Sequence, residues 1–134
     1  MRALIAFPLT ALVVIAYNML AFLPGFAPGA EIGEFTLASG AVVVLTTGDI
    51  LVLAGLIALF FEMLKSARPR GSAIVDHILS VGVLIVAIVE FLLVPSAGTA
   101  SFLIITVLCL VEVTAGFSVS IVAARRDFTV GADR

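Results

Sequence analysis

Acidic side chains inside long apolar stretches are the part of this sequence with the clearest chemical potential. Asp49, Glu90 and Glu112 each lie in a run of apolar residues that contains no lysine or arginine. A charged side chain at the centre of a lipid bilayer costs about 2.5–3.5 kcal/mol on insertion scales, so such groups persist where something stabilises them. We therefore expect each residue to hold a proton, bind a cation or contact a polar partner.

Two uncharged polar residues accompany the three acids. Asn18 lies near the end of the first apolar run, and Thr46 lies one turn before Asp49. At 1.5 Å per helical residue, Asp49, Glu90 and Glu112 would lie roughly 12, 6 and 18 Å below one membrane boundary. Four hypotheses stay open: a proton or cation site, a divalent metal site, contact with a basic group of a partner, or a neutral carboxyl hydrogen-bonded within the fold. No cluster of His or Cys accompanies these residues, so we expect no zinc or copper site, and we assign no metal ligand and no cofactor from the sequence.

The composition indicates the environment in which these residues act. The chain has 134 residues, of which 63% are hydrophobic and 12% charged, and its mean hydropathy is +1.34. Ordinary soluble domains are about 45–50% apolar and about 25% charged. A soluble fold of this length could not bury so much apolar surface. The composition therefore predicts an integral membrane protein and argues against a soluble enzyme or a nucleic-acid-binding protein.

Four apolar runs must position the polar residues. They cover residues 3–23, 41–64, 73–94 and 100–124. Each is long enough for an α-helix to cross a hydrocarbon core of about 30 Å, which needs about 20 residues. Short connectors containing Pro and Gly separate the later runs. We predict an all-α membrane protein in which residues 1–134 form a single domain, an up-down-up-down bundle of four transmembrane helices.

The positive charges predict how this bundle is oriented. With four spans, all seven fall on the side that holds both termini and the middle connector, and the two other connectors have none. The basic residues are Arg2, Lys65, Arg68, Arg70, Arg125, Arg126 and Arg134. We therefore expect both termini in the cytoplasm and a location in the plasma membrane, which is the inner membrane of a bacterium. The basic rim is expected to attract anionic lipid headgroups.

Small residues predict where helices approach one another closely. Ala41, Gly48 and Gly55 recur every seven residues, and Gly116 and Ser120 lie in the last run. Small side chains let the backbones of membrane helices come into contact. The spacing does not distinguish packing within the chain from packing between chains.

The leading functional hypothesis is a small non-enzymatic accessory or assembly subunit that docks against other membrane helices. Its small-residue stripes and its carboxylates, chiefly Asp49 and Glu112, would contact a partner or a bound ion. The alternative is a homo-oligomeric transporter or channel that conducts protons or cations along Asp49, Glu90 and Glu112. An enzyme is not expected, because the short loops leave no room for a catalytic domain. The expected partners are lipid, other membrane helices or further copies of the chain, and not nucleic acid.

Overall fold

The computed structural model describes residues 7–25, 27–66 and 73–131, which are mostly helical. The helices are α2 (Leu9–Ala21), α3 (Thr47–Ser66), α4 (Ala73–Leu93) and α5 (Ala100–Gly131). The last three are long and apolar enough to cross a membrane, over Thr47–Ser66, Val75–Leu93 and Ala100–Ser118. The fourth, α2, is a shorter apolar helix of 13 residues, preceded by Pro8 with an extended backbone. Residues 3–6 of the first expected span lie outside the described residues.

The second expected span differs most from the structure. It was predicted over residues 41–64, but α3 begins only at Thr47. Residues Val42–Thr46 form a strand, β2, which pairs antiparallel with β1 (Glu31–Thr36). Consecutive β-branched residues fit a pleated strand better than a helix, and the run Val42-Val43-Val44 supplies them. Hydrophobicity alone does not distinguish a helix from a strand in a short apolar run.

A tight loop closes this hairpin. The Leu37 amide donates to the Ala41 carbonyl at 2.8 Å, and the Gly40 amide donates to the Leu37 carbonyl at 2.9 Å. Gly40 has a φ of +84°, a left-handed conformation that glycine adopts without steric cost. The hairpin is therefore a specific local structure and a departure from the all-α expectation.

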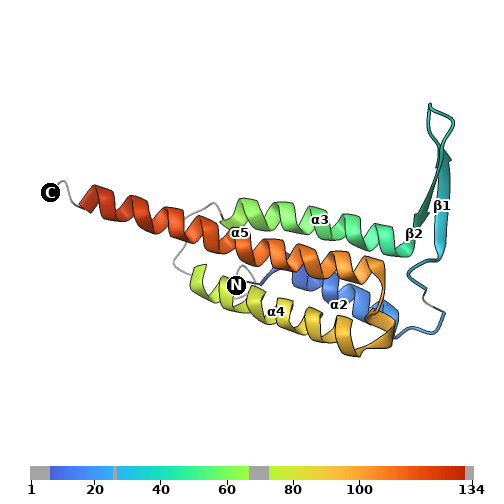
Figure 1. Ribbon diagram of the computed structural model, residues 1–134, viewed down its shortest axis with the longest axis horizontal. Coiled ribbons are helices and arrows are strands. Elements are labelled where there is room, and N and C mark those ends of the chain that lie inside the picture. The colour runs from blue at the N-terminus through green and yellow to red at the C-terminus, as the bar shows by residue number, and fades with distance from the viewer. Residues whose placement is uncertain (1–6, 26, 67–72, 132–134) are drawn as a thin grey trace.

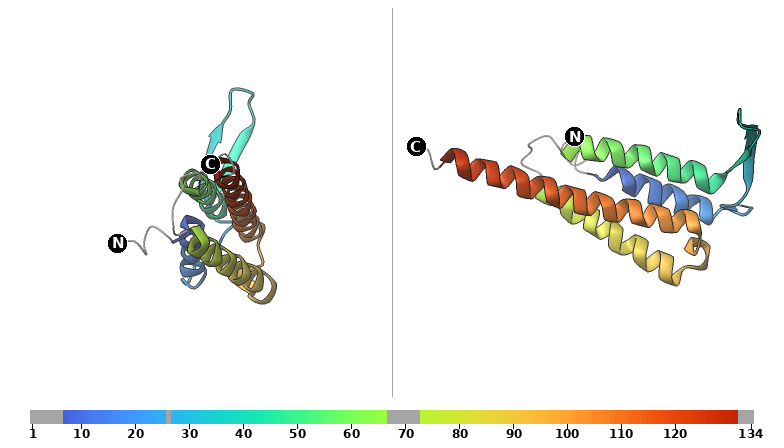
Figure 2. Two further views of the ribbon diagram at one scale, coloured as in Figure 1. Left: turned by 90° about the vertical axis from the view of Figure 1, so that its left-hand side faces the viewer. Right: turned by 45° about the horizontal axis from the view of Figure 1, so that its top comes forward.

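The four helices lie side by side in one bundle, with the hairpin standing at one end (Figures 1 and 2). We call this the hairpin end, and the opposite end, where α5 projects beyond the other helices, the tail end. Helices α2 and α4 end at the hairpin end, where α3 and α5 begin (Figure 1). Helix α5 packs along both α3 and α4, and α2 packs along α3, whereas α2 and α4 meet only loosely.

Tyr17 anchors the core near the hairpin end. Its side chain is fully buried, and its ring lies 4.7 Å from that of Phe102 on α5. Its hydroxyl donates to the Ser96 carbonyl at 3.1 Å and lies 2.7 Å from the Thr99 hydroxyl. Because Ser96 and Thr99 belong to the connection between α4 and α5, this one side chain fixes the end of α2 to that connection.

Two glycines of α3 allow close contact with α5. A Cβ at Gly48 would lie 2.9 Å from the Pro28 carbonyl oxygen and from Ser101 Cβ, and one at Gly55 would lie 2.8 Å from a Leu108 methyl. Seven residues separate the two glycines, and seven separate Ser101 from Leu108. The two helices therefore pack with matched spacing along their common face.

This packing predicts a difference between glycines. Gly48→Ala should destabilise the fold by about 1–3 kcal/mol, because the added methyl meets backbone that cannot rotate away. Gly82 of α4 is the matched control, since a Cβ there has nothing within 4 Å. Gly82→Ala should leave stability unchanged or raise it by up to about 1 kcal/mol, from helix propensity. Thermal unfolding in detergent, followed by circular dichroism, measures both; equal melting temperatures for the two variants would contradict the packing argument.

Candidate functional site

The carboxylate of Glu112 lies inside the bundle and joins three helices. Its side chain is buried, with 7% of the residue exposed. The Ser80 hydroxyl on α4 donates to Glu112 Oε1 at 2.9 Å, and the Thr10 hydroxyl on α2 donates to Oε2. Two hydroxyl donors satisfy both carboxylate oxygens, which is what a carboxyl group in an apolar interior requires. Glu112 is therefore a polar centre of this fold and faces away from the exposed apolar surface of the bundle.

A second buried carboxylate comes from α3, the helix that gives Glu112 no hydrogen bond. Glu62 of α3 is 3% exposed, and its Oε2 accepts the Leu9 amide at 3.1 Å. Its Oε1 lies 2.5 Å from Lys65 Nζ, and Lys65 also donates to the Phe7 carbonyl at 3.4 Å. By taking up the Leu9 amide, Glu62 satisfies one of the amide groups that the first turn of α2 leaves unpaired.

Glu62 is not among the candidate residues that the sequence indicated, because a glutamate three residues before Lys65 has the spacing of an ordinary ion pair on a helix surface. The signal was present in the spacing. Gly48, Gly55 and Glu62 are separated by seven residues each, which places all three on one helical face. Because the two glycines face α5, Glu62 faces α5 as well.

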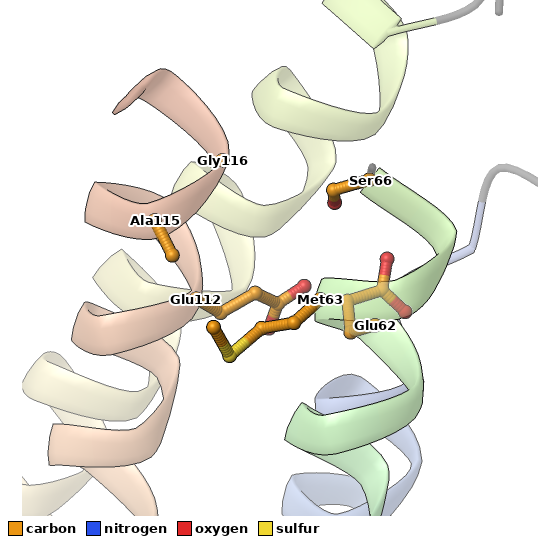
Figure 3. Close-up of a pocket in the computed structure, with 6 residues that line it drawn as sticks. All are labelled: Glu62, Met63, Ser66, Glu112, Ala115 and Gly116. Carbon is orange, nitrogen blue, oxygen red and sulfur yellow. The ribbon is translucent and has the colours of Figure 1, made fainter. Parts of the chain in front are cut away.

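A small cavity lies between α3 and α5, the helices that carry Glu62 and Glu112. It has a volume of about 40 Å³ and is lined by Glu62, Met63, Ser66, Glu112, Ala115 and Gly116. Figure 3 shows the Glu112 side chain extending from α5 toward α3, beside the side chain of Met63. A polar site needs roughly 10–15 Å³ of such volume for each water, so two or three waters fit. The cavity lies toward the tail end, because Ser66 is the last residue of α3.

The His77 side chain of α4 packs against the next turn of α5. His77 of α4 lies over Gly116, where a Cβ would come within 2.8 Å of His77 Nδ1. The His77 ring also stacks on Phe117, with centroids 5.2 Å apart and planes inclined by 18°. Gly116 was expected to support helix packing, and what it accommodates is this ring. The His77 ring thus contacts α5 one helical turn from Glu112.

Asn18 and Glu90 form a separate polar pair near the hairpin end. Asn18 Nδ2 donates to Glu90 Oε2 at 2.7 Å, and both residues are half-buried. Asn18 is three residues from the end of α2, and Glu90 is three residues from the end of α4. These two residues contact one another across α2 and α4, and the structure does not bring them to Glu112.

Asp49 and Thr46 have a local structural role, which corrects the expected depth of Asp49. Asp49 is exposed and lies in the first turn of α3, and is not eight residues inside a helix. Its Oδ2 accepts the Thr46 amide at 2.9 Å and the Thr46 hydroxyl at 2.6 Å. The Asp49 amide donates back to the Thr46 hydroxyl at 3.2 Å. This reciprocal arrangement is a capping box that begins the helix.

Of two further residues of the expected packing stripes, one lies elsewhere and the other stays a prediction. Ala41 is exposed and precedes β2 in the hairpin, so it does not belong to the α3 face that carries Gly48 and Gly55. Ser120 belongs to α5, but its side chain lies outside the described residues.

The site that emerges can hold a proton or a small cation. Two carboxylates from α3 and α5 border one cavity, and one lysine compensates one negative charge. Within residues 7–25, 27–66 and 73–131, no group of three His, Cys, Asp or Glu residues is placed to bind a metal. No model of a known protein family, no curated protein and no solved structure matches this chain.

The geometry predicts how the bundle depends on Glu112. Glu112→Ala should lower stability by about 2–4 kcal/mol, because it leaves two buried hydroxyls without their acceptor and opens a void. Glu112→Gln keeps the shape and one acceptor oxygen, so it should cost about 1 kcal/mol or less. Thermal unfolding in detergent compares the two, with Glu31→Ala in the exposed hairpin as the control. Equal losses for Ala and Gln would mean that the hydroxyl bonds do not support the fold.

Proposed function

We propose that the chain is a multi-pass membrane protein whose four helices cross the bilayer up-down-up-down, with both termini in the cytoplasm. Three helices of spanning length support this placement, and further apolar residues precede α2 in the sequence. Residues 24–40, at the hairpin end, include Glu31 and Glu34 and no lysine or arginine. Lys65 lies at the tail end, so the positive-inside rule assigns that end to the cytoplasm. A plasma membrane, the inner membrane of a bacterium, fits this assignment.

Within that membrane, the function we propose is proton or cation carriage by a homo-oligomer. The observation that carries the proposal is the pair of buried carboxylates, Glu112 and Glu62, which border one cavity with room for a few water molecules. Each comes from a different helix, and Thr10 and Ser80 hold Glu112 in place. A protonated Glu112 can release its proton to water in the cavity, and the two hydroxyls then stabilise the carboxylate that remains.

The same observation counts against docking through these carboxylates. A side chain that is 7% or 3% exposed inside its own bundle has little surface to offer a partner helix. Asp49, the other acid considered for partner contact, already bonds to Thr46. Ion binding is the use that is consistent with an inward-facing carboxylate whose partners come from the same chain.

The surroundings of Glu112 suggest from which side it exchanges its proton. The cavity lies near the tail end, which we assign to the cytoplasm. Toward the hairpin end the buried core is apolar, with Val13, Leu84, Ile105 and Cys109 among its residues. The route from Glu112 to the cytoplasm is therefore the shorter one, whereas passage to the far side requires a second conformation or a path between copies. A homo-oligomer would provide such a path between copies of the chain.

Proton flux in liposomes tests the proposal. Purified protein is reconstituted with a pH-sensitive dye inside the vesicles, and a potassium gradient with valinomycin drives proton movement. Glu112→Gln should abolish the protein-dependent flux, because an amide cannot release a proton at the pH of the assay. The expression level of the variant should stay unchanged. Asp49→Asn, which alters only the helix cap, should retain it. Flux that survives Glu112→Gln, or that disappears equally in both variants, would overturn the proposal.

A second candidate rests on a different observation. Helix α5 continues from Ser118, where its candidate span ends, to Gly131, and Figure 1 shows this end projecting beyond the bundle. A helical end that projects beyond the other described helices leaves room for another protein to pack against it, as expected of an accessory subunit. Gentle purification at native expression level, followed by mass spectrometry of the intact complex, separates the two functions. A stoichiometric foreign membrane protein supports the subunit, and a homo-oligomer supports the carrier.

A further inference from the structure

An apolar groove runs between α2 and α4, away from the carboxylate cavity. Its volume is about 410 Å³, and it exists because these two helices meet only loosely. One wall comes from α2, including Ala11 and Ile15, and the other from α4, including Gly82 and Val86. Gly82 leaves the α4 wall flat, with nothing within 4 Å of where a Cβ would be. The groove can therefore take up an elongated apolar group.

One end of the groove is polar and negatively charged. Asn18 and Glu90 line it at the hairpin end, where Asn18 donates to Glu90 Oε2. The other described residues of the lining are apolar, and none of those residues is basic. Glu90 Oε1 remains available as an acceptor for a cationic donor, since the Asn18 bond occupies Oε2.

The length of the groove matches one leaflet of a bilayer. It extends along α4 from Ile78 to Glu90, twelve residues, which corresponds to roughly 18 Å at 1.5 Å per residue. Half of a hydrocarbon core of about 30 Å is about 15 Å. With the hairpin end at one membrane boundary, Glu90 lies near the headgroups and the apolar part reaches toward the centre of the bilayer.

From this juxtaposition we propose that the groove binds one phospholipid with a primary ammonium headgroup, phosphatidylethanolamine, from the leaflet at the hairpin end. The ammonium group donates a hydrogen bond to Glu90, and one acyl chain lies along Gly82 between α2 and α4. Phosphatidylcholine has the same charge but no N–H donor, and phosphatidylglycerol has neither the positive charge nor the ammonium. The inference rests on the membrane placement proposed above and is independent of proton binding at Glu112.

Native mass spectrometry of the detergent-solubilised protein tests this assignment. The protein is titrated with each of the three lipids, matched in acyl chains, and the bound fraction is measured. We expect a preference for phosphatidylethanolamine over phosphatidylcholine of about tenfold, the factor given by one charge-assisted hydrogen bond at a half-buried site. Glu90→Gln should remove the preference. The matched control, Glu31→Gln on the exposed hairpin, should keep it.

A second pair of variants tests the acyl chain. Gly82→Leu fills the groove and should lower the occupancy of phosphatidylethanolamine about tenfold, without loss of thermal stability. Ala54→Leu, on an exposed position of α3, should leave occupancy unchanged. Equal binding of the three lipids, a preference that survives Glu90→Gln, or a dimer whose association Gly82→Leu disrupts would each overturn the proposal. Because Glu112→Gln should retain the lipid preference, failure here is distinguishable from failure of proton carriage.

Discussion

The requirement to satisfy a carboxyl group inside an apolar bundle constrains the arrangement of all four helices. Glu112 on α5 takes hydroxyl donors from Thr10 on α2 and Ser80 on α4. Glu62 on α3 takes the first amide of α2 and the Lys65 ammonium. Each helix thus contributes to one polar centre, and rotating any of them would leave a buried polar atom without a partner. An unpaired buried polar atom costs more free energy than the loss of one apolar contact. These hydrogen bonds therefore determine how each helix is rotated about its axis.

Close packing between α3 and α5 makes this polar centre possible. The glycine face of α3 brings the two backbones together at Gly48 and Gly55, and the same face continues to Glu62. In the membrane placement proposed above, apolar helices gain little from packing their side chains against one another, so small residues and polar contacts supply the specificity. On α3, the single face that carries Gly48, Gly55 and Glu62 supplies both the close packing and the polar contact.

The sequence allowed the helices and the candidate acids to be found, but not the contacts between them. Hydrophobicity and length predicted four spans, because a long apolar run has few alternatives to a helix. Three of them correspond to helices of spanning length, and the first corresponds to the shorter helix α2. The residues 41–46 were misassigned, because Val-rich runs fit both a helix and a strand, and this error displaced Asp49. Asn18 and Glu90 were expected near one boundary, yet their pairing depends on helix rotation, which packing alone determines. Thr10, a donor to Glu112, carried no signal that distinguishes it from other threonines in apolar runs.

The junction between the hairpin and α3 has a mechanical consequence. Strand β2 ends at Thr46 and α3 begins at Thr47, with no connecting residue between them. The Thr47 and Gly48 amides also bond to the carbonyls of Ala30 and Pro28, at 3.0 and 2.8 Å, so both sides of the hairpin base are attached to the helix. The hairpin and α3 therefore share one rigid junction, and the structure leaves no flexible linker between them. A force on the hairpin would act directly on the helix that carries Glu62 near its other end.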